Sequence, residues 1–367
     1  MQRILLTSAP ALGLGLFLLC TTSCSTLDPQ AWQPASAPEL SGPLALNDQL
    51  TTATTHSLQG WYGPEELLFD KEGNLYTGVH RSPEVFDEGA LLRISPEGQI
   101  EEVLQTNGWI TGIDFGPEGQ LWALVNGTGL VTIEVATGQL SKVATHSETG
   151  QPLLMGSGLK VSRDGRVYFA SLSSTQVTTP AYINRLILEQ KPTGGVYCYN
   201  PATQQVSTLS EGNYFANGLV LAPDESYLLL TETSRYRILK YHLQGPQAGT
   251  WEIWLDNLPG FPNNLSLRPN GNYWLGFTTR RNASLDQIHP KPGMKKLVYG
   301  LPGFLQPKAE PFGMVVELSP DGEIVQALYD PEGTVVAESG AVREHEGVLY
   351  LGGDVLSHVI MYKFSSR

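Results

Sequence analysis

The sequence contains few charged residues, and cations are the scarcer kind. Only 16% of its 367 residues are charged, and 23 lysines and arginines stand against 36 aspartates and glutamates, a net charge of −13. Because phosphate binding needs a basic surface, this balance argues against a nucleic-acid partner. Hydrophobic residues make up 41% of the chain, which is enough for a sizeable core and excludes global disorder.

Cysteine is scarce as well, since the chain has three, too few for a disulfide scaffold. Glycine and proline are abundant instead, with 39 and 25 residues. Such a turn-rich composition argues against a helical bundle.

The N-terminus lacks an apolar run long enough to span a membrane. Residues 4–20 are almost wholly apolar after a short positive start, but Pro10 interrupts them, and a span needs about 20 residues. We therefore interpret residues 1–23 as a cleaved export signal of the lipoprotein type. Two small residues before Cys24 resemble a bacterial lipobox, although Thr21 occupies the usual leucine position.

Lipid on Cys24 would make the protein an exported lipoprotein, anchored to a membrane of the cell envelope or periplasm. Plain secretion and an uncleaved signal anchor are the alternatives. Residues 24–44 are rich in proline and are predicted to form a tether between the anchor and the folded domain.

A repeated phrase organises the rest of the sequence. It consists of an apolar residue, turn formers, a glycine and a β-prone run, and its glycine position falls at Gly73, Gly119, Gly165, Glu225, Gly271 and Gly347. Three of the five steps between these positions are 46 residues long. A second hairpin follows most copies, so each repeat predicts four strands. We therefore predict an all-β fold, a six-bladed β-propeller with four-stranded blades, over residues 45–367.

The repeat also predicts which side chains line the central channel. In a propeller the innermost strand of each blade faces the channel, and each phrase is the turn after that strand. Eight residues before the glycine position, all six residues carry a side-chain oxygen: Glu65, Thr111, Ser157, Asn217, Asn263 and Ser339. Such a ring is a candidate oxygen-ligand site, and a polar, water-filled channel is the alternative.

The strand after each turn returns to the same end of the channel. Seven residues after the glycine position lie His80, Asn126, Leu172, Glu232, Thr278 and Asp354. His80 and Glu232, together with Glu65, are candidate catalytic groups for proton transfer. Thr111, Asn126, Ser339 and Asp354 are candidate substrate-binding groups. The alternative for His80 is a hydrogen bond to loop backbone.

Several segments resemble the strictosidine-synthase-like proteins. They are residues 63–65, 192–194, 215–218, 231–239, 256–264, 289–292 and 343–347. The resemblance covers residues 60–367 and places the sequence among the propellers related to gluconolactonase, regucalcin and paraoxonase, close to the adipocyte plasma-membrane-associated group. It implies a six-bladed propeller and arylesterase-type hydrolysis.

The resemblance also implies a calcium site, whose ligands would be Glu65, Ser157, Asn217 and Asn263. Ser157 replaces an asparagine of the family pattern and Asn263 replaces an aspartate, so one formal charge remains where the family has two. Calcium affinity falls with ligand charge, so weak Ca²⁺ binding is expected. Gly340 occupies the position of the catalytic glutamate of the alkaloid synthases, which argues against strictosidine-type condensation.

Residues 280–311 form an insertion that is both basic and apolar. Six lysines and arginines stand there against Asp286 and Glu310, and apolar residues cluster between Met294 and Leu305. The segment is predicted to be a lid over the channel or a membrane-surface contact, and a packed loop with solvated lysines is the alternative.

Two classes of function remain open at this point. The first is hydrolysis of a small-molecule ester or lactone in the polar channel, with or without Ca²⁺. The second is non-catalytic binding of a ligand or a protein, because propellers host many functions.

Overall fold

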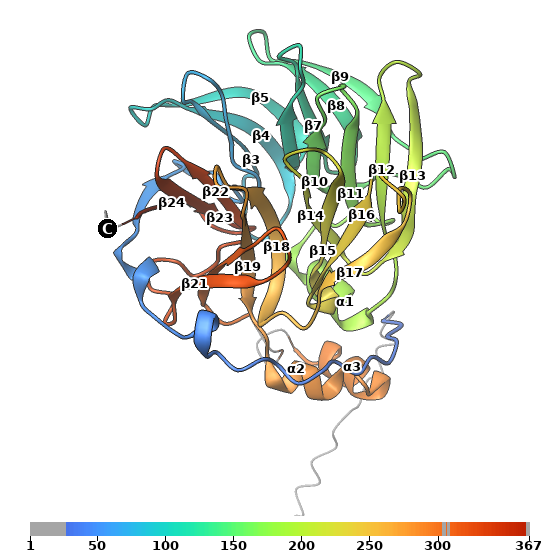
Figure 1. Ribbon diagram of the computed structural model, residues 1–367, viewed down its shortest axis with the longest axis vertical. Coiled ribbons are helices and arrows are strands. Elements are labelled where there is room, and N and C mark those ends of the chain that lie inside the picture. The colour runs from blue at the N-terminus through green and yellow to red at the C-terminus, as the bar shows by residue number, and fades with distance from the viewer. Residues whose placement is uncertain (1–26, 303–305, 307–308, 365–367) are drawn as a thin grey trace, which may run out of the picture.

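The computed structural model describes residues 27–302, 306 and 309–364, so residues 1–26, with the predicted signal and Cys24, lie outside the described residues. Six four-stranded antiparallel sheets stand around a central axis (Figure 1). The predicted six-bladed β-propeller is therefore confirmed.

The first three blades follow the order of the sequence, with the innermost strand first. Blade 1 has β2 (Leu68–Phe69), β3 (Leu75–Val79), β4 (Asp87–Ile94) and β5 (Ile100–Gly108). Blade 2 has β6 (Ile110–Phe115), β7 (Leu121–Val125), β8 (Gly129–Glu134) and β9 (Gln139–Ala144). Blade 3 has β10 (Met155–Val161), β11 (Val167–Ser173), β12 (Gly194–Asn200) and β13 (Gln205–Asn213).

The last blade takes its outermost strand from the start of the domain. Blade 4 has β14 (Ala216–Leu221), β15 (Tyr227–Glu232), β16 (Arg237–His242) and β17 (Trp251–Leu255), and blade 5 has β18 (Gly260–Leu267), β19 (Tyr273–Arg280), β20 (Gly313–Leu318) and β21 (Ile324–Asp330). Blade 6 has β22 (Ala341–His345), β23 (Val348–Gly352), β24 (His358–Lys363) and β1 (Thr54–Ser57). Thr54 pairs with Met361, so a strand from the start of the domain pairs with one from its end and closes the ring.

The repeated phrase forms the turn after each innermost strand, and its glycine position adopts a positive φ in that turn. Gly73, Gly119 and Gly271 have φ of 82°, 86° and 89°. Glu225, which replaces the glycine in the fourth copy, also adopts a positive φ, of 57°. The turn geometry is thus kept even where the residue type changes, at some cost in backbone strain.

Apolar side chains fill the spaces between neighbouring blades. Leu68, Tyr76 and Leu91 of blade 1 form one buried cluster with Ile110 and Ile113 of blade 2. Similar clusters join the other blades, so the core is a ring of layers around the channel and not a single central core.

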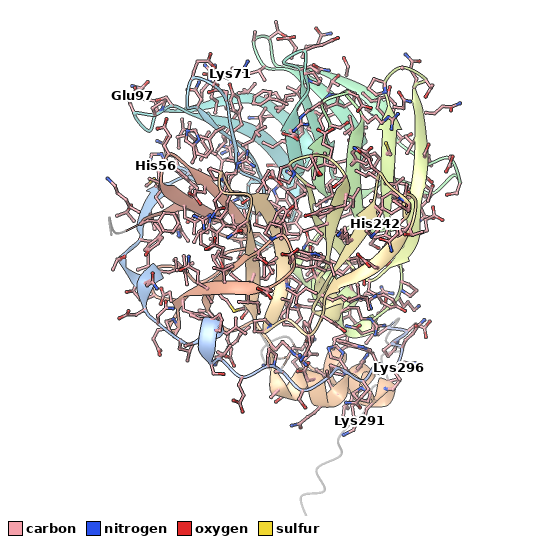
Figure 2. The ribbon with its side chains drawn as sticks, in the orientation of Figure 1. His56, Lys71, Glu97, His242, Lys291 and Lys296 are labelled. Carbon is pink, nitrogen blue, oxygen red and sulfur yellow. The ribbon has the colours of Figure 1, made fainter. Side chains whose placement is uncertain are left out.

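Three α-helices gather at one end of the propeller: α1 (Pro180–Glu189), α2 (Ala283–Ile288) and α3 (Pro292–Tyr299). Helices α2 and α3 belong to the predicted insertion; Lys296 projects from α3, and Lys291 lies at the residue before its start (Figure 2). Asn282 caps α2 by accepting a hydrogen bond from the Leu285 amide. Three short 3₁₀ helices, η1 (Gly42–Leu44), η2 (Gln49–Thr52) and η3 (Thr233–Arg235), complete the described elements.

Residues 27–44, which were predicted to belong to a tether, pack against this end of the propeller. We call them the N-terminal strap. The strap crosses α2 and α3 in Figure 1 and is held by backbone hydrogen bonds, from Gln30 N to Glu189 O (2.8 Å) and from Trp32 N to His289 O (3.1 Å). Leu27 and Leu44 are buried.

Candidate functional site

Four of the six ring residues lie in irregular stretches of the innermost strands. Thr111, Ser157, Asn217 and Asn263 each fall where the pairing of the inner strand with the next strand shifts register. A β-bulge of this kind turns a side chain away from the regular alternation and is common next to active sites. All six ring residues are buried, which matches a level inside the channel.

Glycine after a ring residue lets neighbouring inner strands approach closely. A Cβ atom on Gly112 would collide with the Ser157 carbonyl, and one on Gly218 would collide with the Asn263 carbonyl. The pairs Thr111-Gly112 and Asn217-Gly218 therefore combine a polar group with the close approach that the narrow channel requires.

Two ring residues bond to backbone in neighbouring segments. The Thr111 hydroxyl donates to the Gly156 carbonyl (2.9 Å), and the Ser339 hydroxyl donates to the Met314 carbonyl (2.6 Å). These contacts join blade 2 to blade 3 and the start of blade 6 to blade 5. The two residues, predicted to bind substrate, are thus engaged in holding blades together.

The other four ring residues keep side-chain oxygens in the channel. Ser157 donates a hydrogen bond to Oδ1 of Asn217, whose amide nitrogen donates to Thr233 Oγ1 (3.0 Å). Asn263 donates to Thr278 Oγ1 (3.2 Å). Asn263 Oδ1 and Glu65 Oε2 are buried and have no hydrogen-bond partner among the described residues.

Three carboxyl groups meet at this level: Glu65, Glu338 and Asp354. Burial raises the pKa of Glu65 well above its usual value, and the charge of Asp354, their mutual hydrogen bond and Glu338 raise it further. Burial and Asp354 likewise raise the pKa of Glu338. The pKa of Asp354 is also raised by burial, but its hydrogen bond with Glu65 and the nearby His80 counteract this. These surroundings therefore favour the protonated form of Glu65 over its ionised form.

Glu338 is the functional residue that the sequence reasoning missed. It directly precedes the ring residue Ser339, and its Oε1 accepts a hydrogen bond from the Asp354 amide (3.2 Å). The carboxyl group lies against Gly353, where a Cβ atom would collide with it. The available signal was a glutamate within an otherwise apolar stretch, one residue out of the repeat register.

His80 contacts the backbone of the site residue Asp354. It is fully buried, and its Nε2 lies 2.8 Å from the backbone oxygen of Asp354. Its ring packs edge-on against Phe86 and Trp109, and burial lowers its pKa. The structure thus shows the hydrogen bond to loop backbone that the sequence left as the alternative for His80.

Asn126 and Glu232 are both occupied by other contacts. Asn126 donates to the Val177 carbonyl (2.6 Å). Glu232 pairs with Arg237 and accepts hydrogen bonds from Asn213 (3.2 Å) and from the Tyr214 amide (2.9 Å). Glu232, predicted to be catalytic, is thus engaged at the start of blade 4, and neither residue lines the pocket described next.

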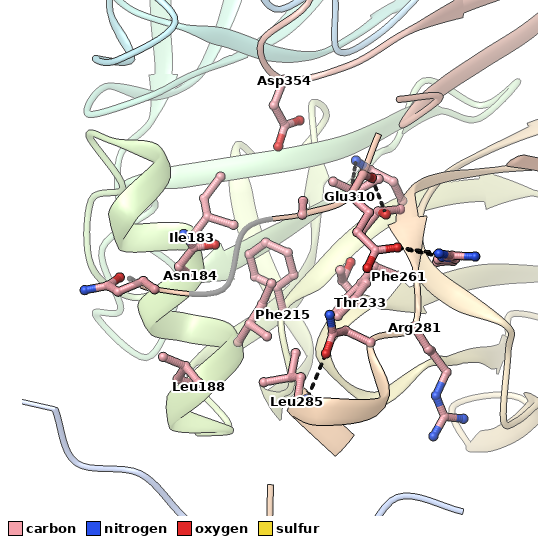
Figure 3. Close-up of a pocket in the computed structure, with 18 of the residues that line it drawn as sticks. Ile183, Asn184, Leu188, Phe215, Thr233, Phe261, Arg281, Leu285, Glu310 and Asp354 are labelled. Carbon is pink, nitrogen blue, oxygen red and sulfur yellow. Dashed lines mark hydrogen bonds and ion pairs between the residues drawn. The ribbon is translucent and has the colours of Figure 1, made fainter. Parts of the chain in front are cut away.

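An apolar pocket of about 140 Å³ opens above the ring. Asn217, Thr233, Asn263, Thr278 and Asp354 supply its polar lining. Ile183 and Leu188 of α1 and Leu285 of α2 supply apolar walls, and in Figure 3 the Asp354 carboxylate points toward them. Val298 of α3 and Glu310 also line it, so the predicted 280–311 insertion forms part of the pocket wall.

The ring offers oxygen atoms to a metal ion, but within the described residues no metal-binding cluster of charged ligands. Among the described residues, no three His, Cys, Asp or Glu side chains form a metal-binding group. A cation would therefore need neutral oxygens as well. The free Glu65 Oε2 and Asn263 Oδ1 are oxygen acceptors of the kind that Ca²⁺ takes, and Ser157 and Asn217 lie beside them. The donor set therefore fits a hard cation, with one carboxylate among its predicted ligands.

Together these features define a six-bladed propeller with a buried acidic site beneath an apolar pocket. Family models agree: strictosidine synthase matches residues 157–246, and the N-terminal region of strictosidine synthase-like proteins matches residues 42–81. The adipocyte plasma membrane-associated protein of Danio rerio is 31% identical over 364 residues, covering 95% of this chain and 86% of the relative. That of Salmo salar is 30% identical, covering 95% and 87%. The chain belongs to the strictosidine-synthase-like family of six-bladed propellers.

Solved structures support the same fold at lower identity. A gluconolactonase from Xanthomonas campestris is 15% identical, with a TM-score of 0.58, and covers 90% of this chain and 97% of its own. A calcium-binding protein, regucalcin, from Agrobacterium tumefaciens is 12% identical, with a TM-score of 0.57, and covers 84% and 93%. Within the described residues, no helix is both long and apolar enough to cross a membrane.

Proposed function

We propose that the protein is a hydrolase that cleaves a small ester or lactone in the pocket above the ring. The observation that carries this proposal is the cluster of Glu65, Glu338 and Asp354 at the level of the ring, where burial raises the pKa of all three carboxyl groups. Carboxyl groups whose pKa values differ because of their surroundings can act as acid and base at neutral pH. The gluconolactonase named above is a relative in fold with activity on a lactone, which is compatible with this assignment.

The pocket suits a compact, mainly apolar substrate. Its volume of about 140 Å³ is close to that of cavities that hold a single aromatic ring. Apolar walls from α1 and α2 exclude water, while the polar floor offers Asn263 and Asp354 to a carbonyl group. The acid part of the ester would therefore lie against the floor and its apolar part under the helices.

The reaction requires one proton to be taken from water and another to be given to the leaving oxygen. Asp354, whose pKa is raised less than that of Glu65, is the base that accepts a proton from water. The water oxygen bonds to the carbonyl carbon, the bond from that carbon to the alkoxy oxygen breaks, and this oxygen takes the proton of Glu65. The proton on Asp354 then returns to Glu65 along their hydrogen bond.

Calcium is the finer part of this proposal. Glu65, Asn217 and Asn263 would hold the ion with Ser157 beside them, and a bound cation would polarise the substrate carbonyl. A cation on Glu65 would replace the proton there, so Glu65 would be either the acid of the step above or a ligand of the ion, and the proton and the metal compete for the same carboxylate. The buried oxygens without partners on Glu65 and Asn263 support this part.

The test measures hydrolysis of phenyl acetate and of a γ-lactone by the full chain, with and without Ca²⁺. Glu65→Gln and Asp354→Asn should each lower kcat at least about 100-fold, the usual contribution of a general acid or base. Glu310→Gln is the matched control, because Glu310 also lines the pocket but pairs with Arg280 at its exposed rim. A folded protein that binds these esters without hydrolysing them would favour the non-catalytic binding propeller.

We further propose that the protein acts outside the cytoplasm, as a membrane-anchored lipoprotein with lipid on Cys24. The apolar run and the sequence Thr21-Thr22-Ser23-Cys24 support this, and the names of the relatives are compatible with membrane association. Mass spectrometry of the mature N-terminus is the test. A mature chain that starts anywhere other than a lipid-modified Cys24 would overturn the anchor.

A further inference from the structure

A second cavity lies between the N-terminal strap and blade 4, apart from the pocket above the ring. Its volume is about 520 Å³, and its lining includes Trp32 of the strap and the three arginines Arg235, Arg237 and Arg281. In an acidic protein, three arginines around one cavity are unexpected. Their partners show which of them has positive charge to offer a ligand.

Two of these arginines are already neutralised by carboxylates. Arg237 pairs with Glu232, and Arg281 pairs with Asp286 while also donating to the Ala35 carbonyl of the strap (2.6 Å). In Figure 3 the Arg281 side chain points away from the pocket above the ring. These two arginines therefore shape the cavity and fasten the strap.

Arg235 has no carboxylate partner among the described residues. Its guanidinium carbon lies 3.7 Å from the ring centre of Tyr214 and 4.7 Å from that of Trp32, so two aromatic rings hold it in place. Its Nε is buried and has no hydrogen-bond partner. A fixed guanidinium with an unused N–H is suited to an oxyanion.

Lys295, which bonds to the strap but does not line the cavity, is a second cation without an acidic partner among the described residues. Its side chain is fully buried, and its one hydrogen bond within the described residues goes to the Gln30 carbonyl of the strap (2.7 Å). Burial and the charge of Arg235 lower the pKa of Lys295 to about 8. A buried ammonium normally has an anion beside it.

His289, which packs against Trp32, is another buried group that is influenced by these positive charges. It is fully buried, and its ring centre lies 5.1 Å from that of Trp32. Neither of its ring nitrogens has a hydrogen-bond partner in the part of the chain that the structure describes. Burial and the charges of Lys295, Arg235 and Arg281 lower its pKa to about 3. The one carboxylate lining the cavity is Asp256, which is exposed and accepts a hydrogen bond from the Asn257 amide (2.8 Å).

We propose that this cavity is a binding site for a phosphate group, with Arg235 as its main ligand and Lys295 as a second source of positive charge. The planar guanidinium matches two phosphate oxygens, and the higher charge of phosphate compared with a carboxylate suits two cations that lack acidic partners. The phosphate would come from a free phosphorylated metabolite or from a phospholipid headgroup. Because Trp32 and Gln30 belong to the strap, the bound phosphate would also hold the strap against α3.

The experiment titrates inorganic phosphate into the full chain by calorimetry, with potassium chloride at equal ionic strength as the reference. The wild type should bind phosphate saturably. Arg235→Gln should weaken the affinity roughly 10- to 100-fold, the value of one or two charged hydrogen bonds. The affinity of Arg235→Lys should lie between those of the wild type and Arg235→Gln. Arg163→Gln is the control, because the Arg163 side chain is 74% exposed on a turn of blade 3.

Further measurements distinguish a phosphate-binding role of Arg235 from a purely structural one. Melting temperatures of Arg235→Gln and the wild type are compared with and without phosphate. If Arg235 is purely structural, the variant loses the same number of degrees in both conditions, and this result would overturn the proposal. Equal binding of acetate or citrate, or no binding of any anion, would also overturn it. Glycerol phosphate that binds as tightly as inorganic phosphate indicates a free metabolite, whereas phosphatidylglycerol vesicles that bind more tightly than either indicate a headgroup, and both support a phosphate site.

Discussion

Glu65 and Glu66 are adjacent in the sequence and both buried, yet they have opposite surroundings. Glu66 has a partner across the channel, because Lys160 Nζ lies 3.1 Å from its Oε1. Burial raises the pKa of Glu66, but Lys160 and Arg343 counteract it. Glu65 faces Asp354 and Glu338 instead, and every neighbouring charge raises its pKa.

The difference separates a structural carboxylate from a reactive one. An ion pair between blades 1 and 3 fixes Glu66, and removing either partner leaves a buried charge. Glu65 retains an oxygen without a partner among the described residues, and its surroundings favour the protonated form, which is a costly arrangement for stability alone. Chemistry in the channel is therefore expected at the level of Glu65 and not at that of Glu66.

The largest expected effect concerns the paired carboxylate. Lys160→Met should lower the free energy of unfolding by about 3–5 kcal/mol, because Glu66 is left buried without its partner. Urea unfolding measures this, with Lys142→Met on the exposed β9 as the control. The double variant Lys160→Met/Glu66→Gln should recover much of the loss. A change below 1 kcal/mol in the single variant would contradict the comparison.

A smaller effect is expected from pH on the unpaired group. The folded protein raises the pKa of Glu65 and Glu338 above their unfolded values, so their contribution to stability is complete below the unfolded pKa and is lost as pH rises through the folded pKa. Each unit of raised pKa corresponds to about 1.4 kcal/mol.

Glu65→Gln should therefore flatten the decline in stability above about pH 4.5, the usual range of a glutamate. Urea unfolding from pH 4.5 to pH 8 measures the slope, and Glu310→Gln should leave it unchanged. An unaltered slope in Glu65→Gln would show that Glu65 is ionised in the folded protein.

The smallest effect is expected from calcium. Millimolar Ca²⁺ should raise the melting temperature by a few degrees at pH 8 and by less at pH 5, because protons compete for Glu65. Glu65→Gln should remove the shift, and Mg²⁺ at the same concentration tests whether the effect is specific. A shift that survives in Glu65→Gln would place the ion elsewhere.

The repeat was sufficient to predict the fold and the level of the channel. A constant step from the glycine position located Glu65, Ser157, Asn217 and Asn263, because every blade presents its inner strand in the same way. The same rule could not show that Thr111 and Ser339 bond to backbone, since that depends on contacts with the neighbouring blade.

Residues outside the repeat could not be placed from the sequence. Glu338 is one residue out of register, and it reaches the site only because β22 begins after a loop that packs against Gly353. The strap escaped prediction for a different reason: its prolines indicate an extended chain, but the groove that receives Trp32 is built from α2, α3 and blade 4.

The strap also determines how the protein responds to a pull from its N-terminus. Strand β1 closes the propeller through only four paired residues, Thr54 to Ser57. Any tension applied upstream reaches the strap first, whose contacts through Gln30, Trp32 and Ala35 would be peeled away in sequence. The contacts of the strap would therefore carry a pull from the N-terminus before the strand pairing that closes the ring.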